Sequence, residues 1–168
     1  MKRWYVVHTR PRQEVVAEEN LLRQAFDVYL PRLKVSRRRR AKWVDVVECL
    51  FPRYLFARID IAVESTALFR STRGVNSLVR FGDQLVHLED EIVAQIRAHE
   101  HPQSGLHQAG GGRFQHGDRV RAVRGPLTDI EGIFLAEKGA DRVVILMHLL
   151  NRDTCVTLPC HHIIPISA

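Results

Sequence analysis

The sequence feature that most constrains the fold is a stretch near residue 100 that has no apolar periodicity. Residues 99–113 read HEHPQSGLHQAGGGR and contain one proline and four glycines. This composition is typical of a flexible linker. We therefore predict an N-terminal domain at residues 1–99, a linker at 100–113 and a C-terminal domain at 114–168. The second domain is so short that its core must be small and its fold simple.

The N-terminal piece alternates between strand-like and helix-like segments. Aromatic and β-branched runs predict strands at residues 4–9, 28–35, 42–48, 54–59, 77–81 and 84–87. Apolar periodicity predicts helices at 13–26 and 89–97, and a short one at 65–70 that Ser65 would cap. In the helix at 13–26, one arc should be buried: Val15, Leu21, Leu22, Ala25 and Phe26. Interleaved elements of this kind predict an α+β or α/β sandwich.

The C-terminal piece contains short apolar runs separated by glycine-containing turns. It predicts strands at 116–124, 132–137, 142–147 and 154–158, which together would form a small β-barrel. The apolar run at 143–150 is equally compatible with a helix, because periodicity does not separate a buried strand from a buried helix.

The positive charge is concentrated at the N-terminal end. Of the net +6, residues 1–45 carry +7, residues 46–100 carry −2 and the remainder +1. Four consecutive arginines, Arg37–Arg40, repel one another and should lie at an exposed hairpin tip that contacts phosphate. A local basic patch favours a polyanionic partner such as nucleic acid, and the alternative is an ordinary solvated surface.

Several classes of protein are disfavoured. No apolar run reaches the length of a membrane span, and the opening segment is too short for a secretory signal. Three cysteines are too few for a disulfide scaffold and indicate a cytoplasmic protein. The spacing of the possible zinc ligands Cys155, Cys160, His161 and His162 matches no common zinc site. We find no phosphate-binding loop and no hydrolase motif, so we expect no enzyme, metal or cofactor.

Four segments together indicate a family. They are the opening Lys2–Val7 strand, LFPRYLF at 50–56, STRGVNSLVRFG at 71–82, and the HGDRV…GP…EG…VI pattern that begins at His116. In this order they resemble the NusG family of transcription elongation factors, and its RfaH-type branch most closely. The resemblance implies an α/β sandwich of the NusG N-terminal type and a KOW domain. That domain would be a β-barrel. In RfaH-type proteins it can also fold as an α-helical hairpin that covers the N-terminal domain; Gly125-Pro126 would lie inside the first helix of that hairpin and favours the barrel, so both states stay open.

The resemblance also implies a function. The N-terminal domain would bind RNA polymerase, suppress pausing and termination, and contact the exposed single-stranded non-template DNA. The KOW domain would contact Rho or a ribosomal protein and so couple transcription to translation. We expect a monomer. Two alternatives stay open: a general NusG-type factor without sequence-specific recruitment, and a ribosome-associated KOW protein that binds RNA.

Family motifs transfer to particular positions. The residues predicted to contact DNA are Arg10, Arg12, Asn20, Arg23, Gln24, Thr72 and Arg73. Those predicted to bind polymerase are His8, Leu50, Phe51, Pro52, Tyr54, Phe56, Ser65, Thr66 and Phe81. Strand alternation places Tyr54 and Phe56 on one face and Leu55 on the other. The resemblance further implies an interdomain ion pair between Glu48 and Arg142. Asn20, His8 and the residues after Thr66 depart from the family pattern.

Overall fold

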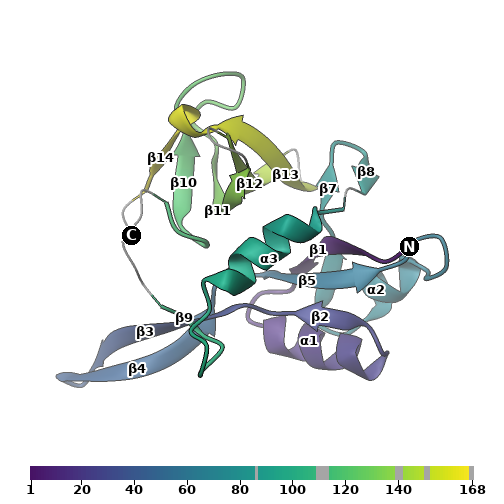
Figure 1. Ribbon diagram of the computed structural model, residues 1–168, viewed down its shortest axis with the longest axis horizontal. Coiled ribbons are helices and arrows are strands. Elements are labelled where there is room, and N and C mark those ends of the chain that lie inside the picture. Colours follow the sequence, from purple (N-terminus) through teal and green to yellow (C-terminus); the bar gives the residue numbers. More distant parts are fainter. Residues whose placement is uncertain (86, 109–113, 139–141, 150–151, 167–168) are drawn as a thin grey trace.

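The protein is described from a computed structural model that covers residues 1–85, 87–108, 114–138, 142–149 and 152–166 (Figure 1). The N-terminal part contains an antiparallel sheet in the order β2-β5-β1-β6. Its strands are β1 (Arg3–Thr9), β2 (Asp27–Tyr29), β5 (Tyr54–Ile59) and β6 (Val75–Leu78). Its helices are α1 (Glu14–Arg23), α2 (Ala67–Ser71) and α3 (Asp90–Ala98). The predicted α+β arrangement is confirmed.

The sheet has a core on each of its two faces. On one face, Leu21 of α1 and Phe69 of α2 share a buried cluster with Leu55 of β5. On the other face, Ile92 and Ile96 of α3 pack with a cluster that includes Phe56. Side chains alternate along a strand, so neighbouring residues of β5 reach opposite cores.

Helix α1 is shorter than predicted, and only part of the predicted arc is buried. It ends at Arg23, and Ala25 follows with a φ of +64°, which is incompatible with a continuing helix. Leu21 and Phe26 are buried as predicted, but Val15, Leu22 and Ala25 are exposed, and Ala17 is buried instead. The helix rests on a tight turn: a Cβ on Gly74 would lie 2.7 Å from the amide nitrogen of Ala17. This close approach selects the face that carries the smallest side chain, which the apolar periodicity did not indicate.

A long hairpin extends away from the sheet. It consists of β3 (Arg32–Arg39) and β4 (Lys42–Cys49), and Arg40 and Ala41 form its turn. The predicted exposed arginine tip is confirmed. At its base, the short strand β9 (His107–Gln108) pairs in parallel with β3, with Leu33 opposite His107. Part of the predicted linker is therefore attached to the hairpin, and residues 109–113 lie outside the described part.

Among its described residues, the C-terminal part forms strands joined by turns and no α-helix. These are β10 (Arg119–Ala122), β11 (Glu131–Lys138), β12 (Arg142–Leu149), β13 (Arg152–Pro159) and β14 (Ile163–Pro165), with a short 3-10 helix at Cys160–His162. Their order is β14-β10-β11-β12-β13. We call residues 114–166 the C-terminal sheet unit. The ambiguous run at 143–150 falls largely in β12, and β14 was not predicted.

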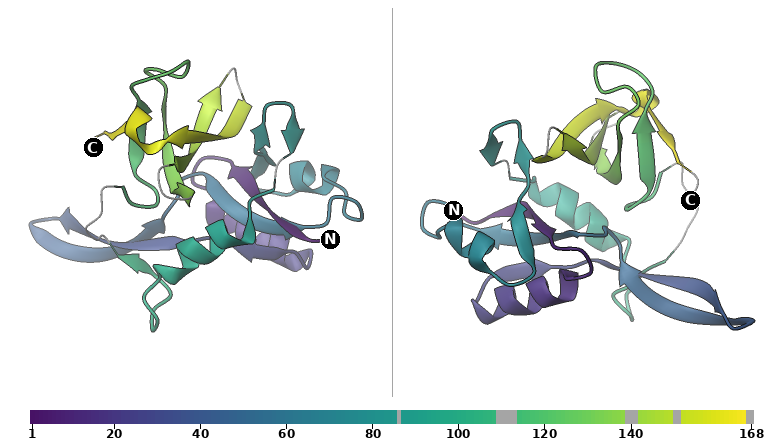
Figure 2. Two further views of the ribbon diagram at one scale, coloured as in Figure 1. Left: turned by 45° about the horizontal axis from the view of Figure 1, so that its top comes forward. Right: turned by 180° about the vertical axis from the view of Figure 1, so that it is seen from behind.

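The C-terminal sheet unit lies against α3 and the end of the N-terminal sheet (Figure 2). A hairpin of the N-terminal part, β7 (Arg80–Phe81) and β8 (Gln84–Leu85), continues its sheet, because Arg80 pairs in parallel with Thr154 of β13. The two parts of the chain therefore share both a sheet and a core.

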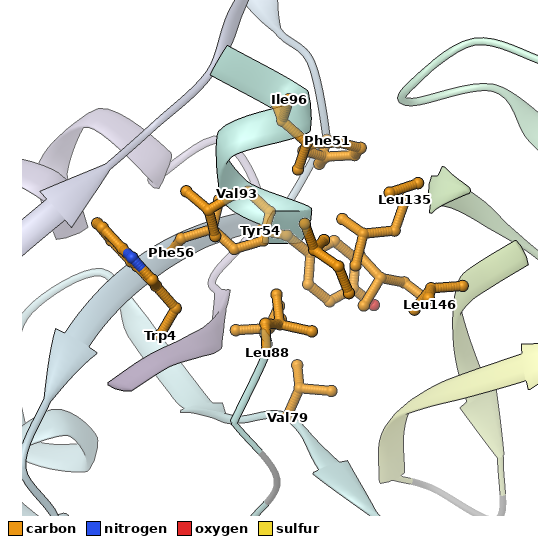
Figure 3. Close-up of a cluster of buried hydrophobic side chains, with 14 of the residues drawn as sticks. Trp4, Phe51, Tyr54, Phe56, Val79, Leu88, Val93, Ile96, Leu135 and Leu146 are labelled. Atoms are coloured by element: carbon orange, nitrogen blue, oxygen red, sulfur yellow. The ribbon is translucent and has the colours of Figure 1, made fainter. Parts of the chain in front are cut away.

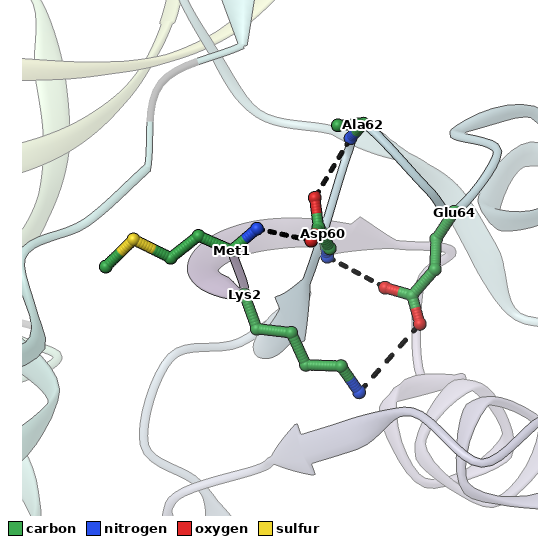
Figure 4. Close-up of polar contacts among 5 residues, drawn as sticks. All are labelled: Met1, Lys2, Asp60, Ala62 and Glu64. Atoms are coloured by element: carbon green, nitrogen blue, oxygen red, sulfur yellow. Dashed lines mark hydrogen bonds and ion pairs between the residues drawn. The ribbon is translucent and has the colours of Figure 1, made fainter.

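The segment between β5 and α2 is tied to the start of β1 by charged groups (Figure 4). The Met1 ammonium pairs with Asp60, whose carboxylate also accepts a 3.1 Å hydrogen bond from the amide of Ala62. Glu64 accepts a 2.8 Å bond from the amide of Asp60 and lies 3.9 Å from the Lys2 ammonium. These contacts hold the residues that lead into α2. Among the described residues, no helix is long and apolar enough to cross a membrane.

Candidate functional site

The predicted polymerase-binding face of β5 is buried. Tyr54 and Phe56 belong to one core cluster and Leu55 to the other, which confirms the predicted alternation. Leu50 and Phe51, in the turn before β5, are buried in the same cluster as Tyr54, whereas Pro52 is exposed.

The C-terminal sheet unit supplies the cover. Its side chains Leu135, Ala136, Val144 and Leu146 belong to the cluster that holds Tyr54. In Figure 3, Leu135 and Leu146 lie on the opposite side of this cluster from Trp4, with Tyr54 between. In this closed arrangement, the apolar face of β5 has no access to another protein.

A buried polar contact joins the two parts at the edge of this cluster. The carboxylate of Asp153, on β13, lies 2.6 Å from Nδ1 of His8, and both side chains are less than one-tenth exposed. Tyr54 donates a 3.2 Å hydrogen bond from its hydroxyl to the other oxygen of Asp153. Burial, followed by the charge of Asp153, raises the pKa of Tyr54, so the phenol stays protonated and remains a donor.

The two parts approach closely at Gly117. Its φ is +88°, and a Cβ placed there would lie 2.1 Å from the carbonyl oxygen of Leu50. The side chain of Gln95, on α3, accepts a 3.1 Å bond from the amide of Glu137, and Glu89, which precedes α3, pairs with Lys138 at 3.3 Å. The closed arrangement thus combines apolar burial with specific polar contacts along α3 and the turn before β5.

The predicted ion pair between Glu48 and Arg142 is not among the ion pairs of the described residues. Glu48 instead accepts bonds of 2.9 and 3.0 Å from the guanidinium of Arg37, on the neighbouring strand of the same hairpin. Arg142 is exposed at the start of β12. The buried polar contacts between the two parts instead involve His8, Tyr54 and Asp153, which the sequence did not pair.

Residues predicted to contact DNA meet where α1 passes the turn before β6. The side-chain amide of Gln24 donates a 2.9 Å hydrogen bond to the hydroxyl of Thr72. The amide of Arg10 donates a 2.8 Å bond to the carbonyl of Gly74, which brings Arg10 beside Arg73. Two segments that are distant in sequence therefore form one polar surface.

The other members of this set lie around that surface. Arg10, Arg12, Arg23, Gln24 and Arg73 are exposed, whereas Thr72 is buried. Asn20 directs its side-chain amide to the carbonyl of Val16 at 2.7 Å, which uses one of its donors locally. The hydroxyl of Thr72 is buried and donates to the carbonyl of Leu68, so it only positions Gln24. What the surface offers is exposed arginines, for which no ion pair is found among the described residues, beside the exposed amide of Gln24, a chemistry that suits phosphate and base edges.

Three further predicted contacts lie elsewhere. Ser65 precedes α2, and its hydroxyl accepts a 3.3 Å bond from the amide of Ala67, while Thr66 is half-buried. Phe81 belongs to β7, but its side chain lies outside the described part of the chain.

The described cysteines and neighbouring histidines are not grouped as a metal site. Burial raises the pKa of the Cys155 thiol to about 12, so it stays protonated. Cys160, His161 and His162 form the short 3-10 helix. Within the residues that the structure describes, no three His, Cys, Asp or Glu side chains are grouped as a metal ion requires.

Sequence reasoning did not identify Asp153 or Gly117 as interface residues. In the sequence, Asp153 lies in a short polar stretch between two predicted strands, which looks like an ordinary turn, but in the structure it belongs to β13. Gly117 is part of the His116-Gly-Asp pattern, so its conformation could have been suspected, but its contact with Leu50 could not.

Comparison with known proteins decides the family. Residues 2–97, more than half of the chain, match the model of the NusG family, described as "Transcription termination factor nusG". The chain belongs to the NusG family. Members of this family are transcription factors, not enzymes.

Two full-length relatives support this assignment. The chain is 27% identical to the transcription termination/antitermination protein NusG of Deinococcus radiodurans, covering 92% of this chain and 94% of that protein. It is 24% identical to the protein of the same name from Rickettsia prowazekii, covering 94% of this chain and 87% of that protein. A Thermotoga maritima NusG structure, titled for its domain interaction, aligns over 99% of this chain with 22% identity and a TM-score of 0.43.

Proposed function

We propose that this NusG-family protein is a transcription elongation and antitermination factor that binds RNA polymerase and suppresses pausing. The relatives are named for termination and antitermination, which supports this reading. The proposed polymerase contacts are His8, Leu50, Phe51, Pro52, Tyr54, Phe56 and Phe81, with a second contact at Ser65 and Thr66.

Because most of these residues are buried, polymerase can bind them only after they have been uncovered. Leu135 and Leu146 occupy the space that a polymerase side chain would need beside Tyr54. Polymerase must therefore compete with the C-terminal sheet unit, which acts as a reversible cover. Once released, this unit, as a KOW-type barrel, is free to contact Rho or a ribosomal protein and to couple transcription to translation.

DNA contact is proposed at the polar surface made by α1 and the turn before β6. The observation that carries this proposal is the hydrogen bond between Gln24 and Thr72, because it joins the two segments into one surface beside Arg10 and Arg73. Cations there would bind the phosphates of the non-template strand, and the amide would read a splayed base. If this contact depends on the base sequence of the non-template strand, the protein would be recruited to particular DNA elements, as expected for the RfaH type.

The test is a gel shift on paused elongation complexes that carry varied non-template strands. Arg23→Ala and Arg73→Ala should each weaken recruitment, and Arg124→Ala, an exposed arginine of the C-terminal sheet unit, serves as the matched control. If both variants bind as well as the control, the proposed DNA surface is wrong.

The same assay separates the second candidate function. The names of the relatives favour a general NusG-type factor, which would bind complexes carrying every strand equally. Capture of ribosomal RNA in place of polymerase would instead indicate a ribosome-associated KOW protein.

A further inference from the structure

We propose that the β3–β4 hairpin is a binding site for single-stranded nucleic acid, in which Trp43 stacks on a base and the arginine tip holds the adjacent phosphates. This site lies apart from the proposed polymerase face and from the surface around Gln24 and Thr72. It needs no polymerase, so it can be tested on the free protein.

The hairpin carries most of the net charge of the protein. Residues 32–49 contain seven Lys and Arg against two Asp and Glu, a net charge of +5. Both acids are engaged within the hairpin: Asp45 lies 3.3 Å from Lys34, and Glu48 binds Arg37. No ion pair of the described residues involves the remaining tip cations, which are Arg38, Arg39, Arg40 and Lys42.

An aromatic side chain stands among these cations. Trp43 is 72% exposed and sits directly opposite Arg38 in the strand register, so both project from the same face. Val47, two pairs further along that face, is also exposed. A large aromatic ring in water has no role in the core, and a ring beside uncompensated cations matches the stacking sites that bind single strands.

The backbone of the hairpin turn also supports a binding role for the tip. Arg40 and Ala41 both have positive φ, at 48° and 65°, in a two-residue loop where glycine or asparagine would be relaxed. This backbone is unfavourable for either side chain, and it presents a fourth arginine at the extreme tip. The base of the hairpin is fixed by its pairing with β9, so the tip projects from a supported platform (Figure 1).

The occupant is a single strand and not a duplex. A duplex offers its phosphates to the arginines, but its base faces are stacked and unavailable to Trp43. DNA and RNA present the same chemistry, and the experiment distinguishes them. An anionic membrane surface could also attract tryptophan and arginine, and it is treated as a competing outcome.

The experiment uses intrinsic fluorescence of the full chain. Trp4 is 8% exposed and Trp43 is 72% exposed, so a ligand that stacks at the hairpin acts mainly on Trp43. The probes are oligo(dT), oligo(U), a DNA duplex of the same length and vesicles of anionic phospholipid. We expect quenching by one or both single strands, and the stronger of the two identifies the source.

Variants separate stacking from charge. Trp43→Ala, followed by fluorescence anisotropy of labelled oligonucleotide, should weaken the single-strand Kd about 5- to 150-fold, with Trp43→Phe retaining part of the affinity. Arg39→Gln should reduce the slope of log K against log salt by about 0.7, whereas Arg124→Gln should leave it unchanged.

Three results would overturn the proposal. Equal binding of duplex without quenching would mean that only phosphates are contacted. A fluorescence change with vesicles but with neither oligonucleotide would indicate a membrane-facing hairpin. Unchanged affinity in Trp43→Ala would exclude stacking. The proposed recruitment function is judged separately, since Arg73→Ala should impair recruitment while Trp43 quenching persists.

Discussion

Replacing Gly117 by alanine should open the closed arrangement by pushing the C-terminal sheet unit away from the turn before β5. The new Cβ would lie 2.1 Å from the carbonyl oxygen of Leu50, whereas unstrained carbon–oxygen contacts are about 3.3 Å. The two parts would therefore have to separate by roughly 1 Å. A gap of this size forfeits up to about half of the dispersion attraction across it. It would also stretch the 3.2 Å bond from Tyr54 to Asp153 beyond hydrogen-bonding range.

The magnitude follows from what overpacking costs. Forcing an extra carbon into a packed contact is destabilising by about 1–3 kcal/mol, which lowers the ratio of closed to open protein about 5- to 150-fold. Alanine at a positive φ adds a backbone cost of about 1–2 kcal/mol in either state. Gly125→Ala is the matched control: its φ is +80°, but its Cβ would make only an ordinary 3.6 Å contact with His162, within the same unit.

The assay is 15N relaxation on the full chain. In the closed protein both parts tumble together, and in Gly117→Ala they should tumble with separate, shorter correlation times, while Gly125→Ala should match the wild type. The opened variant should also bind RNA polymerase more tightly, because Tyr54 and its neighbours no longer need to be uncovered. Identical relaxation in the two glycine variants would refute the proposed clash at Leu50.

The remaining predictions concern pH and the fold of the C-terminal sheet unit. Burial, together with neighbouring His116 and His99, lowers the pKa of His107 to about 4. Between about pH 6.5 and 4 the imidazole is therefore protonated in the unfolded chain but neutral in the folded protein. Because the unfolded chain binds more protons, the free energy of unfolding falls as the pH drops through this window. Between pH 7 and 5 the loss should approach about 2 kcal/mol in denaturant titrations, and His107→Gln should show a flatter profile; an unchanged pH dependence in that variant would contradict the assignment. Because residues 142–149 form strand β12 while packed on the N-terminal part, far-UV circular dichroism should show β structure from residues 114–168 both alone and within the full chain. A helical contribution from these residues in the full chain would instead support a switch of fold.

Local patterns predicted most of the elements because strands and helices depend on neighbours within a few residues. The alternation around Leu55 placed Tyr54 and Phe56 on one face, and the repulsion among the arginines placed them at a hairpin tip. Where the prediction for α1 was wrong, a distant group was responsible: Gly74 lets the helix approach through Ala17, which rotates Leu22 into solvent.

For the candidate sites, too, the sequence predicted the segments but not the contacts between them. The segments that carry Gln24 and Thr72 were recognisable in the sequence, but their hydrogen bond depends on how α1 crosses the sheet. The exposure of Trp43 was likewise not predicted, since a tryptophan in a strand is as compatible with a core as with a surface.

By itself, the sequence determined the order of most of the elements, the basic N-terminal end and the family. Only the tertiary structure decided that the apolar face of β5 is covered by a sheet unit. It also decided that the two parts meet through Tyr54 and Asp153, which are 99 residues apart, rather than through Glu48 and Arg142. The physical reason is that an interface depends on the shape and charge of two finished surfaces, and neither surface exists until its own strands have paired.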